Sequence, residues 1–139
     1  MTEGRRGSCL CGEVRYRTEG DLRGVVYCHC GQCRRQTGHY LAATDVDDRR
    51  IWIEGDGNIS WYAATEFARR GFCKKCGSLL FWKRNGSDRI SVTAGSFHEP
   101  TGLREQCHIF VADKGDYYTL DDDLPQFDRS TGSVPTAGE

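Results

Sequence analysis

Most hydrophobic positions of this chain fall in short stretches. Within them, aromatic or β-branched residues alternate with polar ones, which is the pattern of half-buried strands. The expected strands are Glu13–Arg17, Val25–Tyr27, His39–Ala43, Ile51–Ile53, Ile59–Ala63, Leu79–Trp82, Arg89–Thr93 and His108–Val111.

Glycine-bearing breaks separate these stretches, and the best helical segment is Gln32–Thr37, which has room for one or two turns. Several short strands at close spacing are typical of a sandwich or a barrel-like fold. The sequence therefore predicts an all-β domain with at most a short helix.

Composition shows what such a domain lacks. Hydrophobic residues make up 37% of the 139, and Leu, Ile, Val and Phe together make up about a fifth. So low a share indicates disorder only when the net charge is high, and here the formal charge is −1. We therefore expect a folded domain with a small aliphatic core and some further support. The eight cysteines are the obvious candidates.

The length fits one domain, which we expect over residues 1–120, followed by an acidic and polar C-terminal tail over residues 121–139. No apolar run approaches the roughly 18 residues that span a bilayer, and the N-terminus has no apolar signal core. We expect a cytoplasmic protein without a membrane partner. The near-neutral charge argues against a nucleic-acid partner, and the oligomeric state stays open.

Seven cysteines fall into three clusters, and Cys107 stands apart. Cys73 and Cys76 form a CxxCG turn, whose two thiolates can converge on one ion and supply half of a tetrahedral zinc site. The pair Cys9 and Cys11 is the economical partner. Four thiolates would close a structural zinc site with no position free for substrate.

The remaining cluster holds Cys28, Cys30 and Cys33. Three protein ligands with an exchangeable fourth position are the pattern of a catalytic zinc, so these cysteines are the candidate catalytic residues, acting through an open-site zinc. We expect two zinc ions per chain, with partial occupancy allowed at the second site. The spacing leaves its fourth ligand open among His29, His39, Cys107 and His108.

Other uses of the cysteines stay open at this point. Four disulfides would require an oxidising compartment, and the sequence shows no secretory signal that would indicate one. A thioredoxin-like redox pair would need a βαβ context that the pattern lacks. Both metals could be structural, with a fourth side chain closing the second site, and Cys107 could be a small buried residue.

The order CxCG, CxCxxC and CxxCG resembles the glutathione-dependent formaldehyde-activating enzyme family, which includes the centromere protein V-like proteins. The resemblance covers about residues 7–120 and extends beyond the cysteines. The stretches that carry it are Gly7–Tyr16, Cys28–Gly38, Phe72–Ser78, Gly95–Pro100 and His108–Val111.

This resemblance implies an Mss4-like fold, a β-tent of short antiparallel strands with two zinc sites. It implies a structural zinc on Cys9, Cys11, Cys73 and Cys76, and a second zinc facing the substrate on Cys28, Cys30 and Cys33. The family's named activity joins glutathione and formaldehyde into S-(hydroxymethyl)glutathione. A carbon–sulfur lyase is therefore the expected enzyme class, and a small thiol such as glutathione is the expected partner.

The chemistry of such a site would be thiol–carbonyl addition or its reversal, without a redox change. A thiol on the second zinc is deprotonated and ready to attack a small aldehyde. The residues name no general base. The alternative is a non-enzymatic zinc-binding module for protein interaction with the same Mss4-like fold, and a second site closed by a fourth side chain would favour it.

Overall fold

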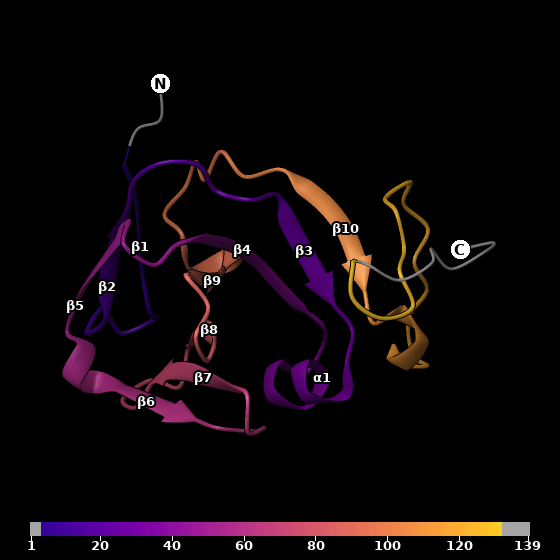
Figure 1. Cartoon of the computed structure of the whole chain (residues 1–139), viewed down its shortest axis with the longest axis horizontal. Coiled ribbons are helices and arrows are strands. Elements are labelled where there is room, and N and C mark those ends of the chain that lie inside the picture. The colour runs from indigo at the N-terminus through magenta and orange to yellow at the C-terminus, as the bar shows by residue number, and fades with distance from the viewer. Residues whose placement is uncertain (1–3, 132–139) are drawn as a thin grey trace. The chain divides into compact units, whose positions relative to one another are not determined.

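The computed structural model describes residues 4–131, and the chain in it forms two compact units (Figure 1). Unit 1 combines the chain up to Arg23 with Thr44–Leu103, and unit 2 combines Gly24–Ala43 with the chain from Arg104 onward. Each unit is thus built from segments that are far apart in the sequence.

Unit 1 contains a three-stranded antiparallel sheet in the order β1 (Arg5–Ser8), β2 (Arg15–Thr18) and β5 (Ile51–Glu54). Side chains alternate between its two faces, so Tyr16 and Thr18 of β2 are buried, whereas Arg15 is exposed and Arg17 is half-buried. One face of this small sheet therefore packs into the core and the other meets solvent.

The remaining strands of unit 1 are antiparallel neighbours in the order β9, β8, β7 and β6. Short 3₁₀ turns at Asp56–Asn58 (η1) and Ala94–Ser96 (η2) lie beside them, and β4 begins in unit 2 and ends in unit 1. The strand bounds are β4 Leu41–Asp47, β6 Ile59–Tyr62, β7 Ala68–Cys73, β8 Leu79–Arg84 and β9 Arg89–Thr93.

Aromatic rings occupy much of the unit 1 core. Tyr16 contacts Phe81 and Phe97 edge-to-face, with ring centroids 5.7 and 5.2 Å apart. Leu80 and Phe81 are among the largest fully buried side chains. Because burying such a side chain stabilises a fold by roughly 1.5–3 kcal/mol, a few aromatic residues offset the scarcity of aliphatic ones.

Unit 2 is built around β3 (Val25–Cys28), which pairs antiparallel with the start of β4 and parallel with β10 (Glu105–Ile109). The helix α1 (Gly31–Thr37) follows β3, and a 3₁₀ turn, η3 (Val111–Asp113), follows β10. Residues 125–129 are hydrogen bonded to this part of the chain; for example, the Phe127 N–H donates to the His108 carbonyl at 3.0 Å. The domain boundary at residue 120 stays a prediction.

The expected all-β class with one short helix is confirmed, and α1 is the one α-helix among residues 4–131. No helix in that range is long and apolar enough to cross a membrane. One pair departs from the expected antiparallel arrangement, because β3 and β10 run parallel to each other. A long stretch of chain joins these two strands, so no tight hairpin forces them to be antiparallel.

Several strand limits also differ from the expectation. The strand expected at His39–Ala43 starts at Leu41 and continues to Asp47. The strand expected at His108–Val111 ends at Ile109, because Phe110 takes a left-handed backbone conformation and η3 begins. The strands β1 and β7 were not expected, since arginines and glycines interrupt their apolar pattern.

Candidate metal centres

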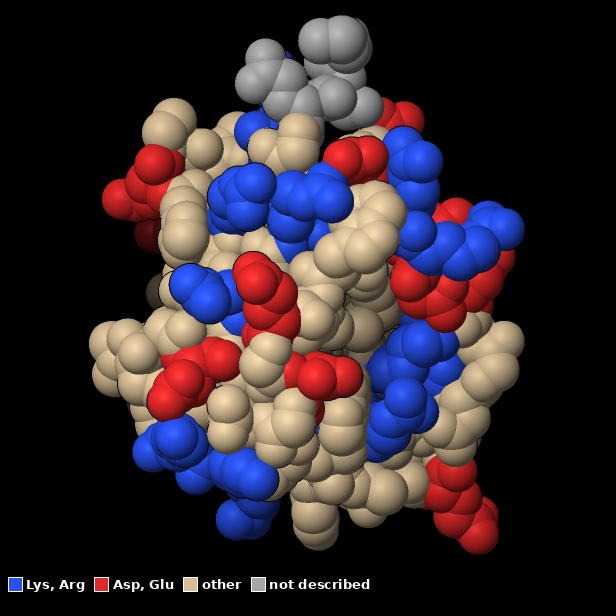
Figure 2. All heavy atoms as spheres, turned by 90° about the vertical axis from the view of Figure 1, so that its left-hand side faces the viewer, with Lys and Arg blue, Asp and Glu red and all other residues tan. Residues whose placement is uncertain are grey.

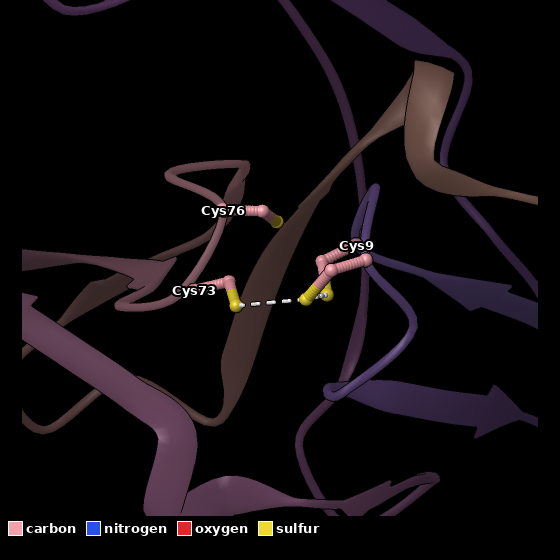
Figure 3. Close-up of side chains that lie close together, drawn as sticks. Cys9, Cys73 and Cys76 are labelled. Carbon is pink, nitrogen blue, oxygen red and sulfur yellow. Dashed lines mark hydrogen bonds between the residues drawn. The ribbon is translucent and has the colours of Figure 1, made fainter.

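Four cysteines of unit 1 come together from two loops. Cys9 and Cys11 lie between β1 and β2, Cys73 ends β7, and Cys76 lies in the turn before β8. Figure 3 shows Cys73 and Cys76 turned toward Cys9. Both loops pass a glycine with left-handed backbone angles just after a cysteine, at Gly12 and Gly77, and this lets each chain turn back around its sulfur atoms.

The sulfur positions fit a tetrahedral ion. Cys9 Sγ lies 3.6 Å from Cys11 Sγ, Cys11 Sγ lies 3.8 Å from Cys73 Sγ, and all four sulfurs lie within 4.8 Å of one another. Four sulfurs at the usual zinc–sulfur distance of about 2.3 Å stand about 3.8 Å apart. The four-cysteine cluster can therefore hold a zinc ion without rearrangement.

Hydrogen-bond donors favour the thiolate form at two of these cysteines, Cys9 and Cys76. The Val14 N–H donates to Cys9 Sγ at 3.3 Å. The side chain and the backbone N–H of Ser78 both form hydrogen bonds to Cys76 and lower the pKa of its thiol to about 5. Because only the thiolate binds a metal tightly, a fixed donor at the sulfur prepares the cluster for an ion.

The second cluster lies in unit 2, where β3 leads into α1. Cys28 ends β3, Cys30 is the N-cap of α1, and Cys33 lies in its first turn. The Cys33 N–H donates to Cys30 Sγ at 3.4 Å, and the three sulfurs lie within 4.8 Å of one another. The first turn of α1 thus places the sulfurs of Cys30 and Cys33 beside the sulfur of Cys28 at the end of β3.

Three sulfurs this close cannot all ionise without a cation. Hydrogen bonds from Cys28 and Cys33 stabilise the Cys30 thiolate and lower its pKa to about 2, and the same sharing raises the pKa of Cys28. A cation that replaces the shared protons would allow all three to bind as thiolates. A soft all-sulfur donor set suits zinc.

The histidines near this cluster are engaged elsewhere. His29, between Cys28 and Cys30, is bonded through Nδ1 to the Tyr118 hydroxyl at 2.6 Å and through Nε2 to His108 Nδ1 at 2.8 Å. His108 Nε2 in turn lies 2.9 Å from the Asp122 carboxylate. Both nitrogens of both rings are therefore committed to hydrogen bonds.

The other expected fourth ligands are not in the cluster either. His39 Nδ1 is bonded to the Tyr117 hydroxyl at 2.9 Å, and Cys107 is buried in β10. Within residues 4–131, no fourth His, Cys, Asp or Glu atom joins the three sulfurs. The geometry leaves the fourth position of a tetrahedral ion to a ligand from outside this part of the chain.

Tyr118 and Asp122, which the sequence pattern did not indicate, complete the series of hydrogen-bonded side chains Tyr118–His29–His108–Asp122. Tyr118 lies near the end of the expected domain and Asp122 in the expected polar tail, and no motif marks either residue in the sequence. The imidazoles of His29 and His108 are both buried. Burial, together with the nearby His108, lowers the pKa of His29 to about 4. His29 is therefore a neutral structural residue at pH 7.

Known proteins resemble this chain over most of its length. It is 27% identical over 113 residues to an uncharacterized lyase of Schizosaccharomyces pombe, a match that covers 81% of this chain and 82% of that protein. A crystal structure of a Rhodobacter sphaeroides protein superimposes with a TM-score of 0.52 at 25% identity, covering 68% of this chain and 88% of the other.

A family model described as glutathione-dependent formaldehyde-activating enzyme matches residues 4–113, which include both cysteine clusters. The order of the three cysteine motifs, the mainly β fold and this match agree with one another. The chain belongs to the glutathione-dependent formaldehyde-activating enzyme family.

Proposed function

We propose that this protein is a zinc-dependent carbon–sulfur lyase that forms or cleaves the adduct of a small thiol with an aldehyde, with glutathione and formaldehyde as the first pair to test. The observation that carries the proposal is the cluster of Cys28, Cys30 and Cys33, three converging sulfurs without a fourth protein donor within residues 4–131. The family's name and a relative named as a lyase support it.

The two clusters would then have different tasks. Cys9, Cys11, Cys73 and Cys76 would hold a zinc ion on four sulfurs, which leaves no position for a substrate. Cys28, Cys30 and Cys33 would hold the second ion on three sulfurs. When bound there, zinc supplies an open position that accepts a substrate thiol as its thiolate.

The proposed reaction needs no redox partner. In the forward direction the lone pair of the thiolate sulfur forms the C–S bond, the π electrons of C=O move onto oxygen, and that oxygen takes up a proton. In the reverse direction the hydroxyl loses its proton, C=O forms again and the C–S bond breaks. The protein's main contribution is to bring a reactive thiolate and an aldehyde together.

Local structure holds the three sulfurs in place for this task. The Thr37 hydroxyl donates to the Cys33 carbonyl at 2.8 Å, which secures the helix that carries Cys33. The His29 N–H donates to the Ile109 carbonyl at 3.0 Å, and the His29 ring is fixed at both nitrogens. The backbone between Cys28 and Cys30 is therefore held from two sides, so the sulfurs keep one arrangement.

The test is substrate turnover by the zinc-loaded protein. Glutathione and formaldehyde are mixed, and the exchange between free and adduct forms is followed by NMR with and without protein. We expect acceleration over the spontaneous rate, and we expect Cys30→Ala to abolish it. Cys107→Ala is the matched control, because it also removes a cysteine of unit 2 but one outside the cluster.

Absence of acceleration with glutathione and with other small thiols would reject the lyase proposal. A second zinc site closed by a fourth protein side chain would instead favour a non-enzymatic module for protein interaction. X-ray absorption at the zinc edge, compared between the unmodified protein and Cys30→Ala, isolates the ligands of the second zinc and counts its sulfur ligands.

A further inference from the structure

The outer face of the three-stranded sheet of unit 1 carries a group of side chains that neither cysteine cluster uses. Register and alternation place two cross-strand rows on this face, Arg6, Arg17 and Trp52 in one and Ser8, Arg15 and Glu54 in the next. Figure 2 views the side of the molecule on which β1, β2 and β5 lie in Figure 1, and groups of basic side chains lie there with acidic side chains between them.

A cavity of about 450 Å³ opens on this face. Its lining includes Arg6, Arg15, Arg17, Trp52, Glu54 and His98. The His98 backbone N–H donates to the Arg6 carbonyl at 2.9 Å, so the segment after η2 forms a wall along β1. This volume is in the usual range for small-molecule sites.

The charges in the cavity are unbalanced. Arg17 forms an ion pair with Glu19 and stacks over the Trp52 ring at 4.4 Å, so it acts as part of the wall. No ion pair is recorded for Arg6 or Arg15 with any residue in the range 4–131. A guanidinium stays charged at any physiological pH, so these two side chains offer permanent positive charge to a ligand.

We propose that this cavity binds a small organic dianion, a phosphate monoester or a dicarboxylate, whose apolar or aromatic part lies against Trp52. The forked donors of Arg6 and Arg15 match the oxygen geometry of phosphate and carboxylate groups. Trp52 is 43% exposed, so it offers apolar surface that a ligand can cover. The proposal is independent of the lyase reaction, because no cysteine of either cluster lines the cavity.

The test measures the binding of three probes to the zinc-loaded full chain at low salt by calorimetry. Adenosine monophosphate represents the phosphate monoesters and phthalate represents the aromatic dicarboxylates, with inorganic phosphate as the probe without an apolar part. We expect at least one organic probe to bind at one site per chain and to shift the NMR signal of the Trp52 indole N–H. Which probe binds more tightly distinguishes the two anion classes.

Three substitutions make the result specific. Arg15→Gln removes a charge-assisted contact and is expected to weaken binding about tenfold or more. Glu54→Gln removes the carboxylate that repels the ligand and is expected to tighten binding several-fold. Arg69→Gln is the control for loss of charge: it removes one arginine charge from another strand of unit 1, where Arg69 stacks on Trp61 at 4.7 Å outside the cavity. The affinity of this variant for the probes should stay within about twofold of the unmodified protein.

The proposal is overturned if neither organic probe saturates. It is also overturned if Arg15→Gln and Arg69→Gln weaken binding equally, because diffuse surface charge would then explain the binding. If Glu54→Gln leaves the affinity for the probes unchanged, the bound anion does not lie near Glu54, which contradicts its placement in this cavity. Equal affinity for inorganic phosphate overturns the assignment of an organic ligand.

Discussion

At the residue scale, the hydrogen bonds that link Tyr118, His29, His108 and Asp122 determine which ring nitrogen of each histidine carries a proton. Asp122 as a carboxylate can only accept, so His108 Nε2 must donate to it at 2.9 Å. The Nδ1 atom of a neutral His108 then accepts from His29 Nε2, and His29 Nδ1 accepts from the Tyr118 hydroxyl. The hydrogen bonds therefore all run in one direction, from Tyr118 toward Asp122.

This direction predicts the tautomers. At pH 8 both His29 and His108 should carry their proton on Nε2. Long-range proton–nitrogen NMR of the imidazole rings reads the tautomers directly. A proton on Nδ1 of either ring contradicts the hydrogen-bond direction, and the exposed His98, which lies outside these hydrogen bonds, serves as an internal reference.

A second residue, Tyr16, predicts how stability depends on alkaline pH. Burial raises the pKa of its phenol above the ordinary value of 10, despite the hydrogen bond to Ser96 Oγ at 2.6 Å. The Tyr16 phenol therefore ionises at a lower pH in the unfolded chain than in the folded protein. Its contribution to the free energy of unfolding is complete below pH 10 and is lost as the pH rises toward the raised pKa of the folded state. Urea unfolding at pH 9 and pH 11 should show a smaller loss in Tyr16→Phe than in the unmodified protein; an equal loss would assign the effect to other groups.

At the scale of elements, the short strands depend on a few buried side chains for their stability. β8 supplies Leu80 and Phe81, which are 0% and 1% exposed. β1 and β7 have little apolar pattern, yet they are strands because their neighbours supply the hydrogen bonds and cover one face. Pairing partners, rather than local propensity, decide such strands.

Leu80→Ala tests this dependence on buried side chains. The substitution leaves a cavity in the unit 1 core, and we expect it to lower the free energy of unfolding by about 2–5 kcal/mol. Chemical denaturation measures the loss. Leu10→Ala makes the same change at a side chain that is 87% exposed, and it should alter stability by less than about 0.5 kcal/mol. Similar effects at both positions would contradict the described core.

At the scale of the whole molecule, two cysteine clusters that could hold metal ions supplement the small aliphatic core. Each cluster lies within one unit, Cys9, Cys11, Cys73 and Cys76 in unit 1 and Cys28, Cys30 and Cys33 in unit 2. The first cluster joins loops more than 60 residues apart, and the second lies within one strand–helix junction. A metal in the first cluster therefore closes a long loop, whereas one in the second does not.

This difference predicts unequal effects of two substitutions. Cys76→Ala should bind one zinc fewer per chain and lose the fold of unit 1, because structural zinc sites contribute on the order of 10 kcal/mol to folding. Cys30→Ala should also lose one zinc but keep its circular dichroism spectrum. Metal content by mass spectrometry and thermal unfolding measure both. Equal loss of fold in the two variants would contradict the division into a structural zinc site and a catalytic one.

The sequence by itself determined the class of fold and the two sets of cysteines. Both depend on local spacing: alternation over a few residues defines strands, and CxxC or CxCxxC segments can close around one ion whatever surrounds them. The helix after Cys30 follows for the same reason, since its first turn carries Cys33. The motif order was specific enough to indicate the family that the comparison with known proteins shows.

Only the tertiary structure decided which candidates stay outside the metal clusters and which residues join them. His29 lies next to two cysteines, yet partners 79 and 89 residues away, His108 and Tyr118, hold its ring. The basic cavity likewise exists because β1, β2 and β5 align their outer faces. Such contacts arise from packing between distant segments, and the direction of a side chain there follows from the register of its neighbours rather than from its own sequence.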